Sequence, residues 1–415
     1  MARIAVGTLR DVKVIGLLSF GHLLSHFYFM LLPPIMPLVR AEFSASYLEV
    51  GLLMTAYALA GALAQTPTGF LVDRIGGRPV LVWGLLIEGL AISGIGFTSD
   101  FWQVFVLYAI GGAANAVFHP ADYAIMSASV GRDRLGRAFS VHLFSGNLGF
   151  ALAPPVMSFL AVQWNWRIGF IVVGAVAALL ALYMWTQGML LDDGAADRAA
   201  RARKKQHDKD GPGRGDVLSG LRLLFSFPIL MCLGFFMMMT LGFTGVRSYF
   251  VATLDMMFHT PNIVANAALS GFLTFSAVGI LAGGVLADRI GPRVSTAVIT
   301  LVVAGASIAL VGAVPLSSAL LIVVMSVSGF LQGLLMPTRD LLIRSVTPDG
   351  SMGKVMGFLS TGMMVSAAVV PAVFGWLLDV GKPGWVFWLS AFFVTGALLT
   401  FTTARSRSGA HRKEA

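Results

Sequence analysis

Charged residues are scarce in this sequence, and their scarcity argues against an ordinary soluble domain. Asp, Glu, Lys and Arg make up only 12% of the 415 residues, whereas about a quarter of a typical soluble chain is charged. Hydrophobic residues account for 57%. Runs of about 20 apolar residues mark membrane-spanning helices, and the chain has room for about twelve of them. The composition therefore predicts an all-α membrane protein.

Cysteine is nearly absent as well, which argues against disulfide bonds and against thiolate metal sites. The single thiol, Cys232, cannot form an internal disulfide, and no paired thiols suggest a metal site. The sequence also lacks a cofactor-binding loop and a nucleophile–base arrangement. We therefore expect neither an enzyme nor a bound cofactor.

Basic residues exceed acidic ones and give a formal net charge of +9, but their distribution argues against a nucleic-acid partner. With the amino terminus inside, 24 of the 29 Lys and Arg fall in cytoplasmic segments, the exceptions being Arg40, Arg167, Lys382, Arg247 and Arg339. This bias follows the positive-inside rule and predicts an inner (plasma) membrane protein with both termini in the cytoplasm. The first apolar run is not followed by a small-residue cleavage site, which predicts a helix rather than a signal peptide.

One stretch of sequence occurs twice, each time between two apolar runs. Gly69-Phe-Leu-Val-Asp73-Arg74-Ile-Gly-Gly-Arg78 returns 215 residues later (284 − 69) as Gly284-Val-Leu-Ala-Asp288-Arg289-Ile-Gly-Pro-Arg293. In each copy we expect the first Gly to let two helices approach closely and the Gly-Gly or Gly-Pro pair to turn the chain. A single copy would fit a basic turn that merely obeys the positive-inside rule, whereas two matching copies indicate an internal repeat.

The repeat divides the sequence into two halves. Four further pairs of residues lie 217 positions apart: Pro120 and Pro337, Gly136 and Gly353, Arg137 and Lys354, and Pro154 and Pro371. We predict an amino-terminal half over 1–190, a carboxy-terminal half over 220–404 and a cytoplasmic tail over 405–415. The charged, apolar-poor stretch 191–219 predicts a flexible cytoplasmic linker. The expected spans are 12–35, 48–71, 80–97, 101–128, 138–162 and 169–190, then 228–252, 264–286, 295–314, 319–343, 353–378 and 385–402.

The doubled stretch resembles the signature loop of the major facilitator superfamily, which lies between the second and third helices of each six-helix half. The resemblance implies two pseudo-symmetric six-helix bundles related by an axis along the membrane normal, which transport by alternating access. It also implies that helices one, four, seven and ten line a central cavity. The gating residues implied by the two loops are Gly69, Asp73, Arg74, Arg78, Gly284, Asp288, Arg289 and Arg293.

Most polar side chains within the apolar runs fall on those four helices. Such groups are costly in hydrocarbon and normally face the bundle interior, which makes each one a functional candidate. The candidate substrate contacts are His22, His26, Asn115, His119, Arg247, Gln332 and Arg339. Arginine presents a planar fork of donors that matches carboxylate, phosphonate or phosphate groups. Alternatively, Arg247 snorkels to the interface and Arg339 is a cytoplasmic helix-end charge.

Three residues, His26, Glu88 and Asp122, are candidates for proton coupling. His22 and His26 share a helix face, and histidine exchanges protons near neutral pH. Alternatively, the two imidazoles form hydrogen bonds with hydroxyls on the next helix and have no role in coupling. Glu88 lies near the middle of the third span, where it serves either coupling or a structural role paired with a hydroxyl or a histidine. A metal site would need further ligands, and only His119 offers itself, so we expect none.

Three stretches of the first half resemble one branch of the superfamily, the fosmidomycin-resistance exporters. They are Gly21-His22-Leu-Leu-Ser25-His26-Phe-Tyr28-Phe-Met-Leu31-Leu-Pro33, Ala116-Val-Phe118-His119-Pro120-Ala-Asp122, and Gly146-Asn147-Leu-Gly149 with Pro154. His26 and Ser25 stand where that branch usually has an acidic residue and Asn, and Asp122 lies one position later than usual. The third stretch also resembles the antiporter signature of drug exporters, whose glycines permit close packing.

These features predict a secondary active transporter that exports a small amphipathic or anionic compound in exchange for protons. The first alternative is proton-coupled uptake of an organic anion, a carboxylate or a phosphonate. An alternative of another class is a non-transporting membrane receptor or assembly factor. The expected partners are a small-molecule substrate, protons and the lipid bilayer, and we expect a monomer. Asp122 and Arg339 occupy matching positions in the two halves (339 − 122 = 217), which predicts a charge pair near the inner mouth.

The signature loops generate a direct test. We expect Asp73 to hold the end of its helix against a neighbouring helix and cytoplasmic arginines, and so to stabilise one state of the transport cycle. Asp73→Asn should slow turnover while leaving expression and substrate affinity intact, because the amide keeps the volume of the carboxylate but not its charge. Initial rates in proteoliposomes measure this. Unchanged turnover in both Asp73→Asn and Asp288→Asn would mean that the loops act only as turns.

Overall fold

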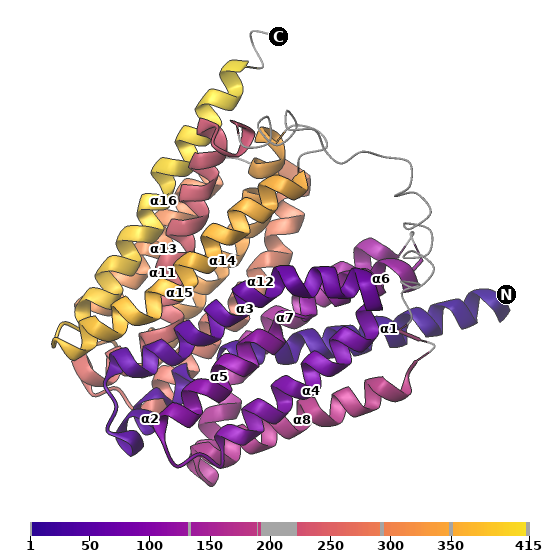
Figure 1. Ribbon diagram of the computed structural model, residues 1–415. Helices are drawn as coiled ribbons and strands as arrows, with labels where there is room; N and C mark the ends of the chain where they lie inside the picture. Colours follow the sequence, from indigo (N-terminus) through magenta and orange to yellow (C-terminus); the bar gives the residue numbers. More distant parts are fainter. Residues whose placement is uncertain are drawn as a thin grey trace. The chain divides into compact units, whose positions relative to one another are not determined.

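The computed structural model describes residues 2–131, 134–188, 190–191, 222–290, 294–347 and 352–411. Within these ranges every regular element is a helix, which confirms the predicted all-α class. The helices form two compact units (Figure 1). Unit 1 contains α1 to α8 except the first turn of α3, and unit 2 contains α11 to α16 together with Ser46–Gly51, which includes that turn. The predicted linker, apart from its first residue, lies outside the described residues.

Unit 1 contains the six spans predicted for the first half, and two of them are interrupted. The first is broken at Pro33 and Pro34, because proline has no N–H to donate to the preceding turn. The fourth is broken at Ala116, whose carbonyl cannot receive a helical hydrogen bond from Pro120. The elements are α1 (Ala2–Phe29), η1 (Pro33–Ile35), α2 (Met36–Phe43), α3 (Tyr47–Ile75), α4 (Gly77–Ile95), α5 (Phe101–Asn115), α6 (Phe118–Ser129), α7 (Leu135–Gln163) and α8 (Trp166–Thr186).

Unit 2 is built from α11 (Phe227–Phe258), α12 (Asn262–Ile290), α13 (Val294–Ala313), α14 (Ser318–Val346), α15 (Met352–Asp379) and α16 (Gly384–His411). Among the described helices of both units, 11 are long and apolar enough to cross a membrane. A further apolar stretch in α16, Gly384–Thr400, is shorter. Long apolar helices suit the bilayer because they satisfy their backbone N–H and C=O groups internally.

The two units share three helix contacts, as the sequence repeat predicted. In unit 1, α1 packs on α7 and α4 packs on α5 and α8; in unit 2, α11 packs on α15 and α13 packs on α14 and α16. A Cβ atom added at Gly112 would overlap the backbone of Tyr57, and one added at Gly329 would overlap the backbone of Phe272. The two glycines are 217 residues apart (329 − 112) and their partners 215 (272 − 57), which are the offsets of the sequence repeat.

The first glycine of each signature loop, Gly69 or Gly284, does not lie at a close approach of two helices. The prediction that it would was wrong. A Cβ atom added at Gly69 or Gly284 would meet no heavy atom within 4 Å. The turn after α3 instead depends on Gly76, whose φ of 96° strongly favours glycine, and on Gly77, where an added Cβ would lie 3.0 Å from the Ala121 carbonyl oxygen. In the first loop it is therefore the Gly-Gly pair that the backbone requires.

Arg78 ties the first signature loop to the end of α8. Its guanidinium donates a hydrogen bond to the Trp185 carbonyl oxygen and lies 5.9 Å from the centre of the Trp185 ring. Arg74, in contrast, is exposed. The side chains of Asp73, Asp288 and Arg289, and the whole of Arg293, lie outside the described part of the chain. The gating role of both loops therefore stays a prediction.

The backbones of α1 and α7 approach each other closely at Gly149. A Cβ atom added there would collide with the Leu23 carbonyl oxygen, and would lie 2.9 Å from the Leu23 carbonyl carbon and 3.1 Å from the Phe27 nitrogen. Because these are backbone atoms, they cannot turn aside. The close packing expected from the glycines of this stretch is therefore confirmed at Gly149.

Gly149→Ala should push α1 and α7 apart. Overpacking of this kind costs about 1–3 kcal/mol, and we expect a lower midpoint of thermal unfolding in detergent. Gly16→Ala is the matched control, because it lies on α1 with nothing within 4 Å of an added Cβ. Equal midpoints for the two variants would contradict the contact.

Candidate functional site

Five titratable side chains meet inside unit 1, and we call them the histidine cluster. Three helices contribute to it: α1, α6 and α7. The sequence singled out four of its members, and the structure adds the fifth from α7. The members are His22 and His26 on α1, His119 and Asp122 on α6, and His142 on α7.

His22 stands at the centre of the cluster. Its ring is stacked on that of His142, with 4.0 Å between ring centres and 18° between ring planes. The ring centre of His26 lies 4.4 Å away and that of His119 lies 5.3 Å away. His142 Nε2 is also 3.5 Å from Asp122 Oδ2. The contacts form a continuous chain from His119 through His22 and His142 to Asp122.

Exposure falls along this chain. His119 is exposed and His26 is half-buried. His22 is 1% exposed, and His142 and Asp122 are completely buried. Both ring nitrogens of His22 and His142 and both carboxylate oxygens of Asp122 have no hydrogen-bond partner among the described residues. Buried polar atoms are normally hydrogen-bonded, and the cluster gathers six atoms that lack such a bond at one position.

Local helix geometry explains why these residues meet. His22 and His26 are one turn apart on α1, and His142 and Gly146 are one turn apart on α7, so each pair shares a face. A Cβ atom added at Gly146 would lie 2.6 Å from His22 Nε2 and 2.9 Å from His26 Cε1. The missing side chain at Gly146 therefore makes room for both imidazoles of α1.

His142 was not among the residues predicted from the sequence. It precedes Gly146 by one helical turn, and that spacing beside a glycine-rich helix contact was the signal available. The expectation that only His119 could join the two histidines of α1 was therefore wrong. Ligand atoms of His22, Asp122 and His142 all lie within 4.8 Å of one another.

A second buried polar group, the Glu88 network, links α1, α3, α4 and α5. The Tyr57 hydroxyl donates to Glu88 Oε1 at 2.7 Å, and Asn115 Nδ2 donates to the same oxygen at 2.8 Å. Asn115 Nδ2 also lies 3.0 Å from Ser25 Oγ. Glu88 is completely buried. Asn115, which we expected to contact substrate, is thus engaged in holding four helices together.

The candidate residues of unit 2 are spread along α11 and α14. Gln332 is buried and Arg247 is half-buried. The Arg339 guanidinium lies 4.6 Å from the centre of the Phe236 ring, a cation–π contact. Seven residues separate Gln332 from Arg339, which amounts to about 10 Å along a helix. The polar residues of unit 2 therefore offer separate positions along a path, in contrast to the compact cluster of unit 1.

Asp122, which we predicted to pair with Arg339, lies close to His142 of unit 1 instead. Asp122 is completely buried beside His142. The Asp122 carboxylate contacts His142, which lies on a neighbouring helix of the same unit. The pair with Arg339 therefore stays a prediction for another state of the cycle.

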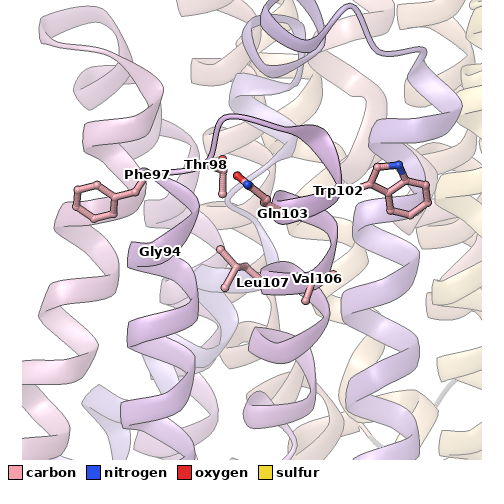
Figure 2. A pocket seen from close by; sticks show the side chains of 7 residues that line it. All are labelled: Gly94, Phe97, Thr98, Trp102, Gln103, Val106 and Leu107. Atoms are coloured by element: carbon pink, nitrogen blue, oxygen red, sulfur yellow. The ribbon is translucent and has the colours of Figure 1, made fainter.

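A shallow cavity of about 530 Å³ lies at the turn between α4 and α5 (Figure 2). Its lining is mainly apolar, and the exposed aromatic side chains of Phe97 and Trp102 stand at its rim. Aromatic side chains at the end of a span are typical of the membrane–water interface. The cavity contains no member of the histidine cluster. The lining residues are Gly94, Phe97, Thr98, Trp102, Gln103, Val106 and Leu107.

Two bundles of apolar helices that repeat one packing plan, with polar side chains gathered inside a bundle, define a multi-pass membrane transporter. The chain belongs to the Major Facilitator Superfamily, whose family model matches residues 18–261 and 242–415. The resemblance carried by the doubled signature loop is thereby confirmed. Proteins of this family are transporters, and the expectation that the chain is not an enzyme is confirmed with it.

Two curated bacterial relatives are similar to the chain over long segments. The fosmidomycin resistance protein of Escherichia coli (strain K12) is 25% identical over 290 residues, which cover 68% of this chain and 66% of that protein. The probable sulfoacetate transporter SauU of Cupriavidus necator is 26% identical over 389 residues, 88% of this chain and 85% of that protein. In the first match the chain thus spans slightly less than two thirds of its relative.

A solved structure shows the same fold. The bacterial homolog of the human lysosomal transporter Spinster, in an inward-facing and unoccupied conformation, matches with a TM-score of 0.71. The match covers 97% of this chain and 96% of that chain at 14% sequence identity. At this identity, the likeness confirms the major facilitator fold and carries no information about substrate.

The Glu88 network generates a stability prediction. Tyr57→Phe removes a donor from a buried carboxyl, which should cost about 1–3 kcal/mol and lower the midpoint of thermal unfolding in detergent. Tyr183→Phe, at an exposed position on α8, is the matched control. Glu88→Gln should keep pH-driven transport, because its amide oxygen still accepts from Tyr57 and Asn115. Loss of that transport at an unchanged midpoint would instead assign Glu88 to proton coupling.

Proposed function

We propose that this chain is a secondary active transporter that exports a small amphipathic or anionic compound in exchange for protons by alternating access. The observation that carries the proposal is the histidine cluster, which runs from the exposed His119 to the completely buried Asp122. Ionisable residues within membrane helices typically mark ion and proton pathways. An arrangement of four imidazoles and one carboxyl has no counterpart among the described residues of unit 2.

The chemistry of the cluster suits proton exchange. An imidazole accepts a proton at one nitrogen and releases one from the other, so neighbouring rings can relay protons. His119 meets protons from water, and His22 and His142 pass them inward over ring-centre distances of 5.3 and 4.0 Å. At the end of the chain, His142 and Asp122 share a proton as either imidazolium with carboxylate or imidazole with carboxylic acid.

The cost of burying charge explains how a proton can bias the cycle. An unpaired charge in a low-dielectric interior is expensive, and adding or removing one proton therefore changes the free energy of the closed bundle. A ligand moves a conformational equilibrium only by its differential affinity for the two states. A proton that is bound in one state and released in the other supplies that difference.

Substrate binding is the proposed role of the polar residues on α11 and α14. Arg247 and Arg339 offer permanent positive charges, which suit a carboxylate, a phosphonate or a sulfonate. The second candidate function, proton-coupled uptake of an organic anion, is favoured by these two arginines and by the similarity to a probable sulfoacetate transporter. Gln332 adds a buried amide on the same helix as Arg339.

We further propose that the two halves, 1–190 and 220–404, are joined by a cytoplasmic linker and that both termini face the cytoplasm. The bias of 24 of the 29 Lys and Arg toward one side supports this orientation. A single chain carries both halves of the transport unit, which supports function as a monomer.

Asp122→Asn tests the coupling role. The amide occupies the same space but cannot take up or release a proton, so accumulation driven by a pH gradient should be lost. Counterflow exchange, which moves no net proton, should remain. Both are measured in proteoliposomes with a substrate identified by ligand-induced thermal stabilisation, starting from fosmidomycin and sulfoacetate, the compounds named for the two relatives.

The control is Asp255→Asn, which changes a carboxylate of α11 outside the cluster and should transport like the parent chain. Intact pH-driven accumulation in Asp122→Asn would contradict the proposal. If both activities are lost and the midpoint of thermal unfolding also falls, Asp122 supports folding rather than coupling.

A further inference from the structure

Three members of the histidine cluster hold ligand atoms that converge inside unit 1. The ligand atoms of His22, Asp122 and His142 lie within 4.8 Å of one another. His142 Nε2 and Asp122 Oδ2 are 3.5 Å apart, close to the roughly 3.4 Å expected between two ligands of a tetrahedral ion with bonds of about 2.0–2.1 Å. Three different helices supply these atoms, so the bundle itself brings them together.

The same three side chains are sealed from solvent. His22 is 1% exposed, and Asp122 and His142 are 0% exposed. All six of their nitrogen and oxygen atoms lack a hydrogen-bond partner within the described part of the chain. In the Glu88 network of the same bundle, one carboxyl oxygen, Oε1, accepts two hydrogen bonds, and only Oε2 lacks a partner among the described residues. A single cation bound between the three side chains would engage an atom of each of them at once.

We propose that His22, His142 and Asp122 bind one divalent first-row transition-metal ion. Two imidazoles and a carboxylate are typical ligands of Zn²⁺, Co²⁺, Ni²⁺ and Fe²⁺, whereas Mg²⁺ and Ca²⁺ prefer oxygen ligands alone. The ion is held inside one bundle, which favours a resident ion over a transported one. His26 and the exposed His119, whose ring centres lie 4.4 and 5.3 Å from that of His22, offer a fourth ligand and a route inward.

Binding requires one ring to turn. The rings of His22 and His142 are stacked with only 18° between their planes, and a ligating imidazole holds its ion in the plane of the ring. One of the two imidazoles must therefore rotate out of the stack before both nitrogens can point at the same ion. Metal binding consequently excludes the stacked arrangement through which protons are relayed.

This exclusion has a functional consequence, which rests on the proposed proton exchange. A bound dication requires deprotonated ligands and occupies the groups that would otherwise carry protons. Zn²⁺ should therefore inhibit transport driven by a pH gradient. The binding itself does not depend on any transport activity and is tested separately.

The test measures metal binding to the purified full-length chain without a polyhistidine tag. Isothermal titration with Zn²⁺ should show one ion per chain, and Co²⁺ should give the visible absorption bands of a low-symmetry site with nitrogen ligands. His142→Asn and Asp122→Asn should each weaken Zn²⁺ binding at least about tenfold and abolish the Co²⁺ bands. His259→Asn is the matched control, because this histidine caps α11 in a left-handed conformation that Asn accepts.

Circular dichroism and the midpoint of thermal unfolding identify any variant that fails to fold. For such a variant, the His22→Asn exchange provides a second test of the same ligand set. The metal site is overturned if the parent chain does not bind Zn²⁺, or if binding persists in all three substituted variants. Either result leaves the proposed proton coupling intact. Zn²⁺ binding without inhibition of pH-driven transport retains the site and counts against the proton relay.

Discussion

The candidate site depends on the close approach of α1 and α7. Gly149 lets the two backbones touch, and Gly146 leaves space that the rings of His22 and His26 fill. With α7 held this close, the ring of His142 stacks on that of His22. A side chain at either glycine would separate the helices and disperse the imidazoles. The position of the chemistry is thus set by two residues that carry no chemistry of their own.

Burial of polar groups in the membrane is costly, and unit 1 contains two buried polar groups that differ in their hydrogen bonding. In the Glu88 network, Tyr57 and Asn115 donate to one carboxyl oxygen, and the network links four helices. In the histidine cluster, the ring nitrogens of His22 and His142 and the carboxyl oxygens of Asp122 lie close together without hydrogen bonds among the described residues. The Glu88 network favours one structure, because movement of its helices would break these hydrogen bonds. An unsatisfied cluster gains from binding a proton or a cation, which is the property that a coupling site requires.

The repeat, the spans and most of the cluster were predictable from the sequence, because each has a local signal. Apolar runs and the two signature stretches identify the helices and their order, and polar residues in hydrocarbon identify His22, His26, His119 and Asp122. It was harder to predict which face of each helix is buried. Spans that are apolar on every side have no hydrophobic stripe to show which face is buried. For this reason His142 was overlooked and Gly69 was assigned a helix contact that it does not make, although each lies on a correctly predicted span.

The two halves share their packing but differ in their polar chemistry. Gly112 and Gly329 make equivalent helix contacts. At the same offset of 217, however, the paired residues are Asn115 and Gln332, His119 and Met336, Asp122 and Arg339, and His142 and Leu359. The first half thus carries groups that gain and lose protons, and the second carries a charge that stays fixed. Because each ligand shifts a conformational equilibrium through its own differential affinity, protons in one half and an anion at the other can bias the same movement without sharing a site. In the proposed mechanism, repetition of the scaffold supplies the movement, and divergence of its polar residues supplies the coupling.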